Sequence, residues 1–350
     1  MAVYALWNNK GGVGKSYLTF QLACEYARTH AEQRVLVVDL CPQANSSGML
    51  LGGMVRGEIA IDELAGATPP RTISGYIADR IVSPYVDPRS GAQFVIRVGD
   101  RNPHVPENLW LVCGDEELEM QSPYVRGACS NGPADSWRIV HTWVRNLIHD
   151  IQKSWDQEDV AVFIDCNPSF TIMTELAMCA SDRLLIPFSA DASSKRAVRS
   201  VLSLVYGIQR RPGQAVSEFF RNATQFRMSL PGIYSYIGNR LTQYNTSASA
   251  FRSVVTEVFS EVFRVWQTNP QLFVVHPFGS PAPTKRQDFR KMYEIEINDT
   301  NTASVVSGAL GIPMCSLTAG IKRLTKDVMV NQAQLDKQQP NIASFVQSIE

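Results

Sequence analysis

The sequence predicts an α/β fold: a doubly wound, mostly parallel sheet with helices on both faces and irregular insertions. Apolar runs without polar alternation are typical of strands that are buried on both faces. Such runs occupy residues 2–7, 35–38 and 160–164. After the first run, apolar residues recur at helical spacing over 17–27. Strands that alternate with helices in this way indicate parallel neighbours in one sheet.

Length and charge set limits on organisation and partners. The 350 residues are enough for one large α/β domain or two average ones. We expect a single domain over 1–350, with insertions at about 55–107 and 210–231. Lys plus Arg and Asp plus Glu both number 33, so the net charge is zero. Any binding to nucleic acid must therefore depend on a local basic patch.

Cysteine and histidine usage argues against a disulfide framework and a zinc site. The 7 cysteines are odd in number, scattered and without a C-x-x-C pair, which indicates a reducing cytosol. The 5 histidines are isolated from one another. No signal peptide precedes the first strand, and no apolar run approaches the length needed to span a bilayer. We therefore expect a cytoplasmic protein and no membrane partner.

A glycine-rich loop joins the first strand to the first helix. Its sequence is Asn9-Lys10-Gly11-Gly12-Val13-Gly14-Lys15-Ser16. Backbone N–H groups curl around an anion at φ angles that side chains often forbid, and the start of a helix adds partial positive charge. We expect Lys15 to lie along the β- and γ-phosphates of a nucleotide and the Ser16 hydroxyl to bind Mg²⁺.

Two later strands end in an aspartate. Asp39 follows the run at 35–38, and Asp165 follows the run at 160–164. Open α/β sheets bind their ligands at the carboxyl ends of the strands, so both side chains would lie near the glycine loop. We expect Asp165 to hold the Mg²⁺ shell, usually through water, because Mg²⁺ keeps several of its waters. A strand-end Asp that caps the next turn is the alternative for Asp39.

The glycine loop resembles the deviant P-loop, KGG-x-GK-[ST], of the ParA/MinD family of partition and positioning ATPases. The resemblance implies that Lys10 reaches across a dimer interface to the nucleotide held by the other subunit. It also implies ATP as the nucleotide and a catalytic set of Lys10, Lys15 and Asp39. The residues implied in nucleotide binding are Lys10, Gly11, Gly12, Val13, Gly14, Lys15, Ser16 and Tyr17.

The segment that begins at Asp39 resembles the D-x-D-P-Q-x-N switch of the same family. Pro42, Gln43 and Asn45 match this pattern, whereas Cys41 replaces the second Asp. The resemblance implies that Asp39 positions the water that attacks the γ-phosphate. It also adds Asp39 to Ser16 and Asp165 as a metal-site residue. The Cys41 departure puts any role of a second carboxylate in doubt.

Later segments extend the resemblance over nearly the whole chain. Residues 160–169 resemble the family's hhhhD-x-P-P-S, with Asn167 in place of the first proline. Residues 233–240 resemble a family strand that ends in N-R. The resemblance implies that Asn239 reads the adenine edge, since an amide can pair its donor and acceptor with the base. An asparagine in an ordinary strand-end turn is the alternative.

The remaining elements are predicted from spacing and composition. We expect helices at 134–155, 193–209 and 248–266, and strands at 108–113 and 272–275. Residues 66–106 are rich in Gly and Pro and show little helical period. This stretch therefore predicts an irregular chain, with a short hairpin around 94–98.

The family resemblance implies an ATP-driven switch in which two subunits face each other across two ATP–Mg²⁺ complexes. The leading hypothesis is DNA partition or cargo positioning. The ATP-bound homodimer would then grip nucleoid DNA without sequence preference, and an adaptor protein would stimulate release. The expected DNA contacts are Lys285, Arg286, Arg290 and Lys291, with Lys195, Arg196 and Arg199 or Lys322, Arg323 and Lys326 as second choices. Most such clusters are simply solvated faces.

Two other functions stay open on the sequence. A MinD-like membrane-positioned ATPase would end in a basic amphipathic helix, but residues 341–350 contain no Lys or Arg. A metabolic enzyme of the same P-loop class would use ATP on a small substrate or carry an iron–sulfur cluster. The scattered cysteines offer no evident cluster ligands, with Cys129 the one candidate that the spacing leaves open.

Overall fold

The computed structural model describes residues 2–349 apart from 158, 190, 212, 242–245, 299 and 301. Its main sheet has eight strands in the order β3-β4-β2-β5-β1-β6-β7-β8. All neighbouring pairs are parallel except β3 and β4, which are antiparallel. The predicted α/β fold class is therefore confirmed. The strands are β1 Ala2–Leu6, β2 Arg34–Leu40, β3 Val95–Arg97, β4 Leu109–Val112, β5 Val160–Cys166, β6 Arg183–Phe188, β7 Gly232–Leu241 and β8 Glu294–Asn298.

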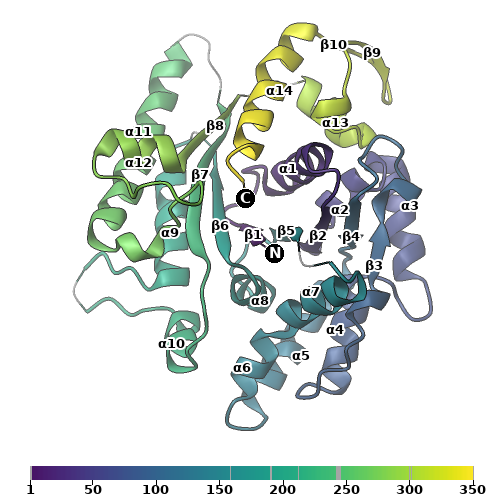
Figure 1. The fold of residues 1–350 in the computed structure, drawn as a ribbon, viewed down its shortest axis with the longest axis vertical. Coiled ribbons are helices and arrows are strands. Elements are labelled where there is room, and N and C mark those ends of the chain that lie inside the picture. The colour runs from purple at the N-terminus through teal and green to yellow at the C-terminus, as the bar shows by residue number, and fades with distance from the viewer. Residues whose placement is uncertain are drawn as a thin grey trace.

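Helices cover both faces of this sheet (Figure 1). One face packs against α1 Lys15–Thr29, α2 Asn45–Leu50, α3 Gly53–Ala65, α13 Thr302–Leu310 and α14 Gln332–Val346. The opposite face packs against a larger set of helices. These are α4 Ile73–Val82, α5 Glu117–Ser130, α6 Ser136–His141, α7 Trp143–Ser154, α8 Ile172–Ala180, α9 Ser194–Tyr206, α10 Glu218–Gln225, α11 Thr246–Thr268 and α12 Arg286–Tyr293.

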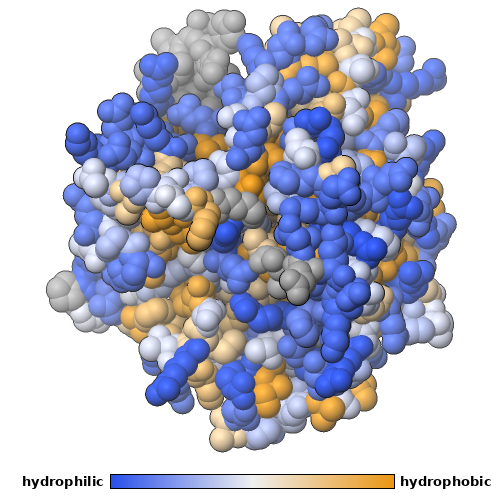
Figure 2. Space-filling view, in the orientation of Figure 1, coloured by the Kyte–Doolittle hydropathy of each residue, from blue (hydrophilic) through white to orange (hydrophobic). Residues whose placement is uncertain are grey.

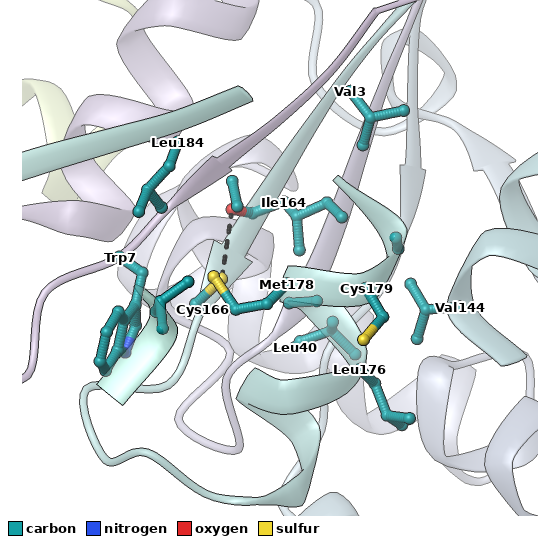
Figure 3. Packing of buried hydrophobic residues seen from close by; sticks show 14 of the residues in the cluster. Val3, Trp7, Leu40, Val144, Ile164, Cys166, Leu176, Met178, Cys179 and Leu184 are labelled. Atoms are coloured by element: carbon teal, nitrogen blue, oxygen red, sulfur yellow. Dashed lines mark hydrogen bonds between the residues drawn. The ribbon is translucent and has the colours of Figure 1, made fainter. Parts of the chain in front are cut away.

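Alternate residues of each central strand enter opposite cores, because successive side chains of a strand point to opposite faces. In β5, Ile164 and Cys166 face the core under α7 and α8, where Figure 3 shows Cys166 beside Met178. Phe163 faces the core under α1. Asp165 shares the parity of Phe163, so its carboxylate lies on the α1 face of the sheet. The apolar runs lack alternation because both faces are covered.

The stretch 66–106 is more regular than its Gly and Pro content predicts. It contains α4, whose N-cap Thr72 accepts a hydrogen bond from the Gly75 N–H at 3.4 Å. Tyr76 and Ile77 bury the apolar face of this helix. Residues 95–97, within the segment where a short hairpin is predicted, form β3, which pairs antiparallel with the next strand, β4, at the edge of the main sheet. Burial of a short apolar face here outweighs weak local propensity.

Other boundaries also differ from the expected ones. The helix predicted at 134–155 is divided at Thr142 into α6 and α7. The strand predicted at 272–275 is a 3₁₀ turn, Pro270–Leu272, followed by a single bridge from Phe273 to Ile233. A separate hairpin forms from β9 Gly320–Arg323 and β10 Asp327–Val330. The insertion limits at 55–107 and 210–231 stay predictions. Within the described ranges, no helix is both long and apolar enough to cross a bilayer.

Candidate nucleotide site

The glycine loop has the backbone shape that an anion cradle requires. Gly12 and Gly14 have φ angles of 74° and 84°, in the left-handed region that favours glycine. Gly14 forms the N-cap of α1, so the start of this helix points its free N–H groups into the loop. The loop base is fixed by Asn8, whose Nδ2 donates to the Pro187 carbonyl at 2.7 Å.

Lys15 is a buried cation at the bottom of the loop. Its Nζ donates to the Lys10 carbonyl at 2.9 Å and to the Asn8 carbonyl at 3.4 Å. Burial lowers the pKa of Lys15, and the nearby Asp165 charge acts in the opposite direction. The described neighbours thus give the ammonium neutral carbonyl partners. A phosphate beside it would supply the compensating negative charge.

The loop opens into a cavity of about 740 Å³, within the range of small-molecule sites. One wall is the glycine loop with Ser16 and Tyr17. The other walls come from residues 41–49, the start of α3 and the exposed side of α13. Among the described lining residues, Glu58 of α3 is the sole carboxylate. The cavity therefore gathers segments from both halves of the chain around the predicted phosphate loop.

Asp165 lies beneath this cavity and is fully buried. Neither of its carboxylate oxygens has a hydrogen-bond partner among the described residues. Burial raises the pKa of Asp165, and the charge of Asp39 raises it further. Ser16, Ser46 and Lys15 partly offset this rise. Two unpaired buried carboxylate oxygens are costly unless a cation satisfies them, so the chemistry of this residue fits a divalent metal.

Asp39 is equally buried, but both of its carboxylate oxygens accept hydrogen bonds. Its Oδ2 accepts from the Ser46 hydroxyl at 2.8 Å and from the Ser47 hydroxyl and N–H at 2.8 and 3.0 Å. Its Oδ1 accepts from the Cys41 N–H at 3.0 Å. Burial raises the pKa of Asp39, and these hydrogen bonds lower it. Asp39 thus anchors the segment 41–47 and does not line the cavity.

Cys41, two residues further on, does line the cavity. Burial and the charges of Asp39 and Asp165 raise the pKa of this thiol to about 12, so it stays protonated at neutral pH. The residue of this segment that faces the cavity is therefore an uncharged thiol. The sequence signal for this difference was the replacement of the second Asp of the D-x-D pattern by Cys41.

Lys10 is bound within its own chain in this structure. Its Nζ forms an ion pair with Asp191 and a hydrogen bond to the Ser189 hydroxyl at 3.1 Å. Burial opposes ionisation of Asp191, but the hydrogen bonds from Lys10, Ser189 and Ser193 leave its pKa below the usual range. Asp191 lies 181 residues from Lys10, and no motif in the sequence identifies it.

Asn239 lies beneath the glycine loop, where its Nδ2 donates to the Val13 carbonyl at 2.9 Å. A Cβ at Gly14 would lie 2.1 Å from this Nδ2, so glycine is required there by close packing as well as by φ. The Asn239 Oδ1 has no hydrogen-bond partner among the described residues. The structure thus brings Asn239 to the loop, but it is not among the residues that line the cavity.

The side chains predicted to contact DNA differ in whether their charges are already paired with other residues of the chain. The Arg286 guanidinium lies 4.6 Å from the Phe259 ring centroid. Arg290 contacts the same ring and binds Glu294 at 2.6 Å. Lys285 and Lys291 are exposed and form no ion pair among the described residues. Of the second choices, Lys195 and Arg199 pair with Glu257 and Glu261, and Lys322 binds the Thr318 hydroxyl, whereas Arg196, Arg323 and Lys326 are exposed.

The described residues contain no group of three or more His, Cys, Asp or Glu side chains placed to hold a metal ion by themselves. A metal at Asp165 would therefore need further ligands from Ser16, water and the bound phosphates, as is usual for Mg²⁺. All seven cysteines are free. Cys129 lies 4.0 Å from the Nδ1 of His141.

Comparison with known proteins is consistent with this geometry. Residues 1–78 match the family model of the AAA domain. An uncharacterised protein of Pseudomonas putida is 25% identical over 234 residues, which cover 65% of this chain and 72% of that protein.

Solved structures with a similar fold include a McdA and a ParA. A complex of a Cyanothece McdA variant with ATP has a TM-score of 0.59 at 16% identity and covers 100% of this chain and 98% of that chain. The pNOB8 ParA has a TM-score of 0.50 at 17% identity and covers 84% of this chain and 80% of that chain. The resemblance found in the sequence is thereby confirmed: the chain carries an AAA-domain sequence in its first 78 residues and has the fold of the ParA/MinD-type P-loop ATPases.

Proposed function

We propose that this chain binds ATP with Mg²⁺ in the 740 Å³ cavity and acts as an ATP-driven dimer switch. The observation that carries the proposal is the pairing of a buried cation, Lys15, with a buried unpaired carboxylate, Asp165, at the base of the cavity. One suits a phosphate and the other a divalent metal. The McdA relative was solved with ATP, which supports the choice of nucleotide.

Asp165 and Ser16 would hold the metal. A bound Mg²⁺ would supply positive charge against the negative charge that develops on the phosphates during phosphoryl transfer. Asp39 adds a second negative charge beside Asp165, but both of its carboxylate oxygens already accept hydrogen bonds. We therefore assign it an electrostatic part in the metal site, in contrast to that of Asp165.

For hydrolysis, we assign Asp39 the part of a positioning residue. Its hydrogen bonds hold residues 41–47 against the end of β2, and Cys41, Gln43 and Asn45 of this segment line the cavity. A segment that contacts the terminal phosphate can order the attacking water. It can also change conformation when hydrolysis removes that phosphate. The side chain nearest to Asp39 that lines the cavity is the neutral Cys41, so we expect slow hydrolysis.

The dimer step requires Lys10 to leave its own chain. In trans it would place a cation on the nucleotide of the other subunit, as the family resemblance implies. An arginine finger with a comparable place in other phosphoryl-transfer enzymes raises the rate about 10³- to 10⁵-fold. In this structure Lys10 forms an ion pair with Asp191 of its own chain. ATP binding by a second copy would compete for the same ammonium.

The biological use that we propose is DNA partition or cargo positioning, with the ATP-bound dimer on nucleoid DNA and an adaptor protein that stimulates release. The fold shared with ParA supports this use. The contacts that we favour are Lys285 and Lys291, since their charges are not compensated by a described ion pair. Because the net charge of the chain is zero, binding should need the doubled patch of a dimer.

A retention experiment tests this proposal. Unrelated DNA duplexes and anionic vesicles are each mixed with the protein in ATP, ADP or no nucleotide. We expect the protein to retain DNA but not vesicles, and to do so only in the presence of ATP. The affinity should be similar for every duplex, since phosphate contacts carry no sequence information. Log affinity should fall linearly with log salt, with a slope of about −0.9 per phosphate contact.

Variants make the same experiment specific to the patch. Lys285→Ala with Lys291→Ala should weaken binding to all duplexes and flatten the salt slope by about one unit for each DNA phosphate that the variant no longer neutralises. Lys153→Ala, an exposed lysine on α7, is the matched control and should leave the slope unchanged. Retention of vesicles in place of DNA, or no ATP-dependent retention at low salt, would overturn the partition function while leaving ATP binding intact.

A further inference from the structure

A second cavity, of about 580 Å³, shares a wall with the nucleotide cavity. Met54 of α3 and Val305 of α13 line both. Its other walls come from the loop after β3, from the turn that follows α13, and from the end of β9. We call it the arginine groove because its described lining includes Arg56, Arg101 and Arg323 and no Asp or Glu.

The floor of the groove is apolar, and much of it is exposed. The apolar residues that line it include Val55, Val305, Ala309, Leu310, Ile312 and Leu324. Val55 is 71% exposed and Val305 is 61% exposed. Side chains of this size are costly to leave in water, at about 25 cal/mol for each Å² of apolar surface. Contiguous exposed apolar surface beside charged residues is typical of an interaction site.

The groove is preformed because its walls are fixed by close backbone contacts. The buried amide of Asn102 donates to the Leu50 carbonyl and to the Gly311 carbonyl, both at 2.8 Å. A Cβ at Gly53 would lie 2.2 Å from the Ala309 carbonyl oxygen. The start of α3 and the end of α13 are therefore packed backbone to backbone. A ligand would not have to order these segments, which reduces the entropic cost of binding.

The charges in the groove indicate the sign of the occupant. Arg101 is compensated by Glu63 at 2.6 Å. Arg56 and Arg323 are exposed and form no ion pair among the described residues. They stand on different elements, α3 and β9, and both line the groove. His104 lines the same groove. An occupant with carboxylates at its edges and apolar side chains between them would satisfy both features.

The size of the apolar surface favours a protein segment as the occupant. Beyond the groove, Ile321 and Met329 of the β9–β10 hairpin are 64% and 52% exposed. Figure 2 shows apolar residues among polar ones at this upper edge of the molecule. Exposed apolar side chains therefore lie both in the groove and on the hairpin whose strand β9 supplies Arg323 to the groove. We propose that the arginine groove binds a short acidic and apolar peptide segment of a partner protein.

The proposal is tested with selected peptides and the full chain, without nucleotide, so that its outcome does not depend on ATP binding. A display library of random twelve-residue peptides is selected on the wild-type protein. Enriched peptides are synthesised with a fluorescent label, and their affinities are measured by anisotropy. We expect enriched sequences to combine at least two carboxylates with apolar residues. No enrichment, or enrichment of basic or uncharged peptides, would overturn the proposal.

Variants place the peptide on the groove. Arg56→Glu with Arg323→Glu should weaken binding at least tenfold, and Val55→Asp at least threefold. These side chains are exposed, so the variants should fold normally, and circular dichroism with a thermal melt checks this. Arg221→Glu, an exposed arginine on α10, is the matched control and should bind within twofold of wild type. Unchanged binding in the double variant would refute the assignment.

Two other occupants would also overturn the proposal. If dodecanoate binds in the groove more tightly than the best peptide, the occupant is a small amphipathic anion. If the nucleotide-free protein dimerises at micromolar concentration, and the Arg56→Glu, Arg323→Glu variant abolishes this dimer, the occupant is a second copy of the chain. Calorimetry and analytical ultracentrifugation give these two results directly.

Discussion

Asp39 and Asp165 are register partners on the neighbouring parallel strands β2 and β5. Both side chains are fully buried on the α1 face of the sheet, so two carboxylates lie side by side next to the glycine loop. Their surroundings give them different parts. Asp39 accepts four hydrogen bonds from the segment that follows it. Asp165 accepts none from the described residues, which is why we propose it as the metal ligand.

The anchoring role of Asp39 predicts a loss of stability when its carboxylate is removed. Asp39→Ala leaves two backbone N–H groups and two hydroxyls without their acceptor, and each unsatisfied buried group costs about 1–3 kcal/mol. Because the hydroxyls can turn to other partners, we expect the free energy of unfolding to fall by about 3 kcal/mol in urea titrations. Glu58→Ala, at an exposed carboxylate of the same cavity, should change it by less than about 0.5 kcal/mol. Equal stability of Asp39→Ala and wild type would contradict this role.

Because Cys41 is neutral, we expect hydrolysis to be limited by the lack of a carboxylate at position 41 of the cavity wall. A positioned general base contributes about 10²- to 10⁴-fold to a rate, and the raised pKa of Cys41, about 12, excludes this part for the thiol at neutral pH. Cys41→Asp should therefore raise the single-turnover rate of ATP hydrolysis at least tenfold. Cys41→Ser, which keeps size and neutrality, should stay within twofold. An unchanged rate in Cys41→Asp, with ATP binding retained, would show that this position does not limit the chemistry.

The ion pair between Lys10 and Asp191 predicts a cost to dimer formation. Asp191→Ala frees the ammonium, so the dissociation constant of the ATP-bound dimer should fall at least threefold in analytical ultracentrifugation. Asp135→Ala breaks a comparable exposed pair with Arg138 and serves as the control, with no expected change. The gain should vanish in the Lys10→Ala, Asp191→Ala double variant. A gain that persists there would mean that Asp191 acts through another residue.

The parts of the fold that the sequence predicts correctly are those where one physical signal dominates. The unalternated runs in β1, β2 and β5 could belong only to strands covered on both faces, and the glycine loop between β1 and α1 has few backbone shapes open to it. Helix α4 was missed because its glycine and the prolines around it weaken the local signal. Burial of Tyr76 and Ile77 in the tertiary structure decides its conformation.

In the candidate site, too, the local sequence predicts some features, whereas others depend on residues that are far apart in the chain. The places of Lys15, Asp39 and Asp165 follow from strand ends, which the pattern reveals. The contacts that distinguish their roles do not, because they depend on side-chain direction. Ser46 and Ser47 are close in sequence to Asp39, but nothing in the pattern shows that they donate three hydrogen bonds to its carboxylate. The partners of Lys10 and Asn239 lie 181 and 226 residues away, beyond the reach of any motif.

The central claim, that Lys15 receives phosphate and Asp165 receives the metal, is tested most directly by titration calorimetry of ATP with and without Mg²⁺. Wild type should bind ATP at least tenfold more tightly when Mg²⁺ is present. Asp165→Asn should keep the metal-free affinity and lose this gain, because the amide carries no charge to offer the cation. Lys15→Ala should lose binding under both conditions. If Asp165→Asn shows the wild-type dependence on Mg²⁺, the assignment of Asp165 to the metal is wrong.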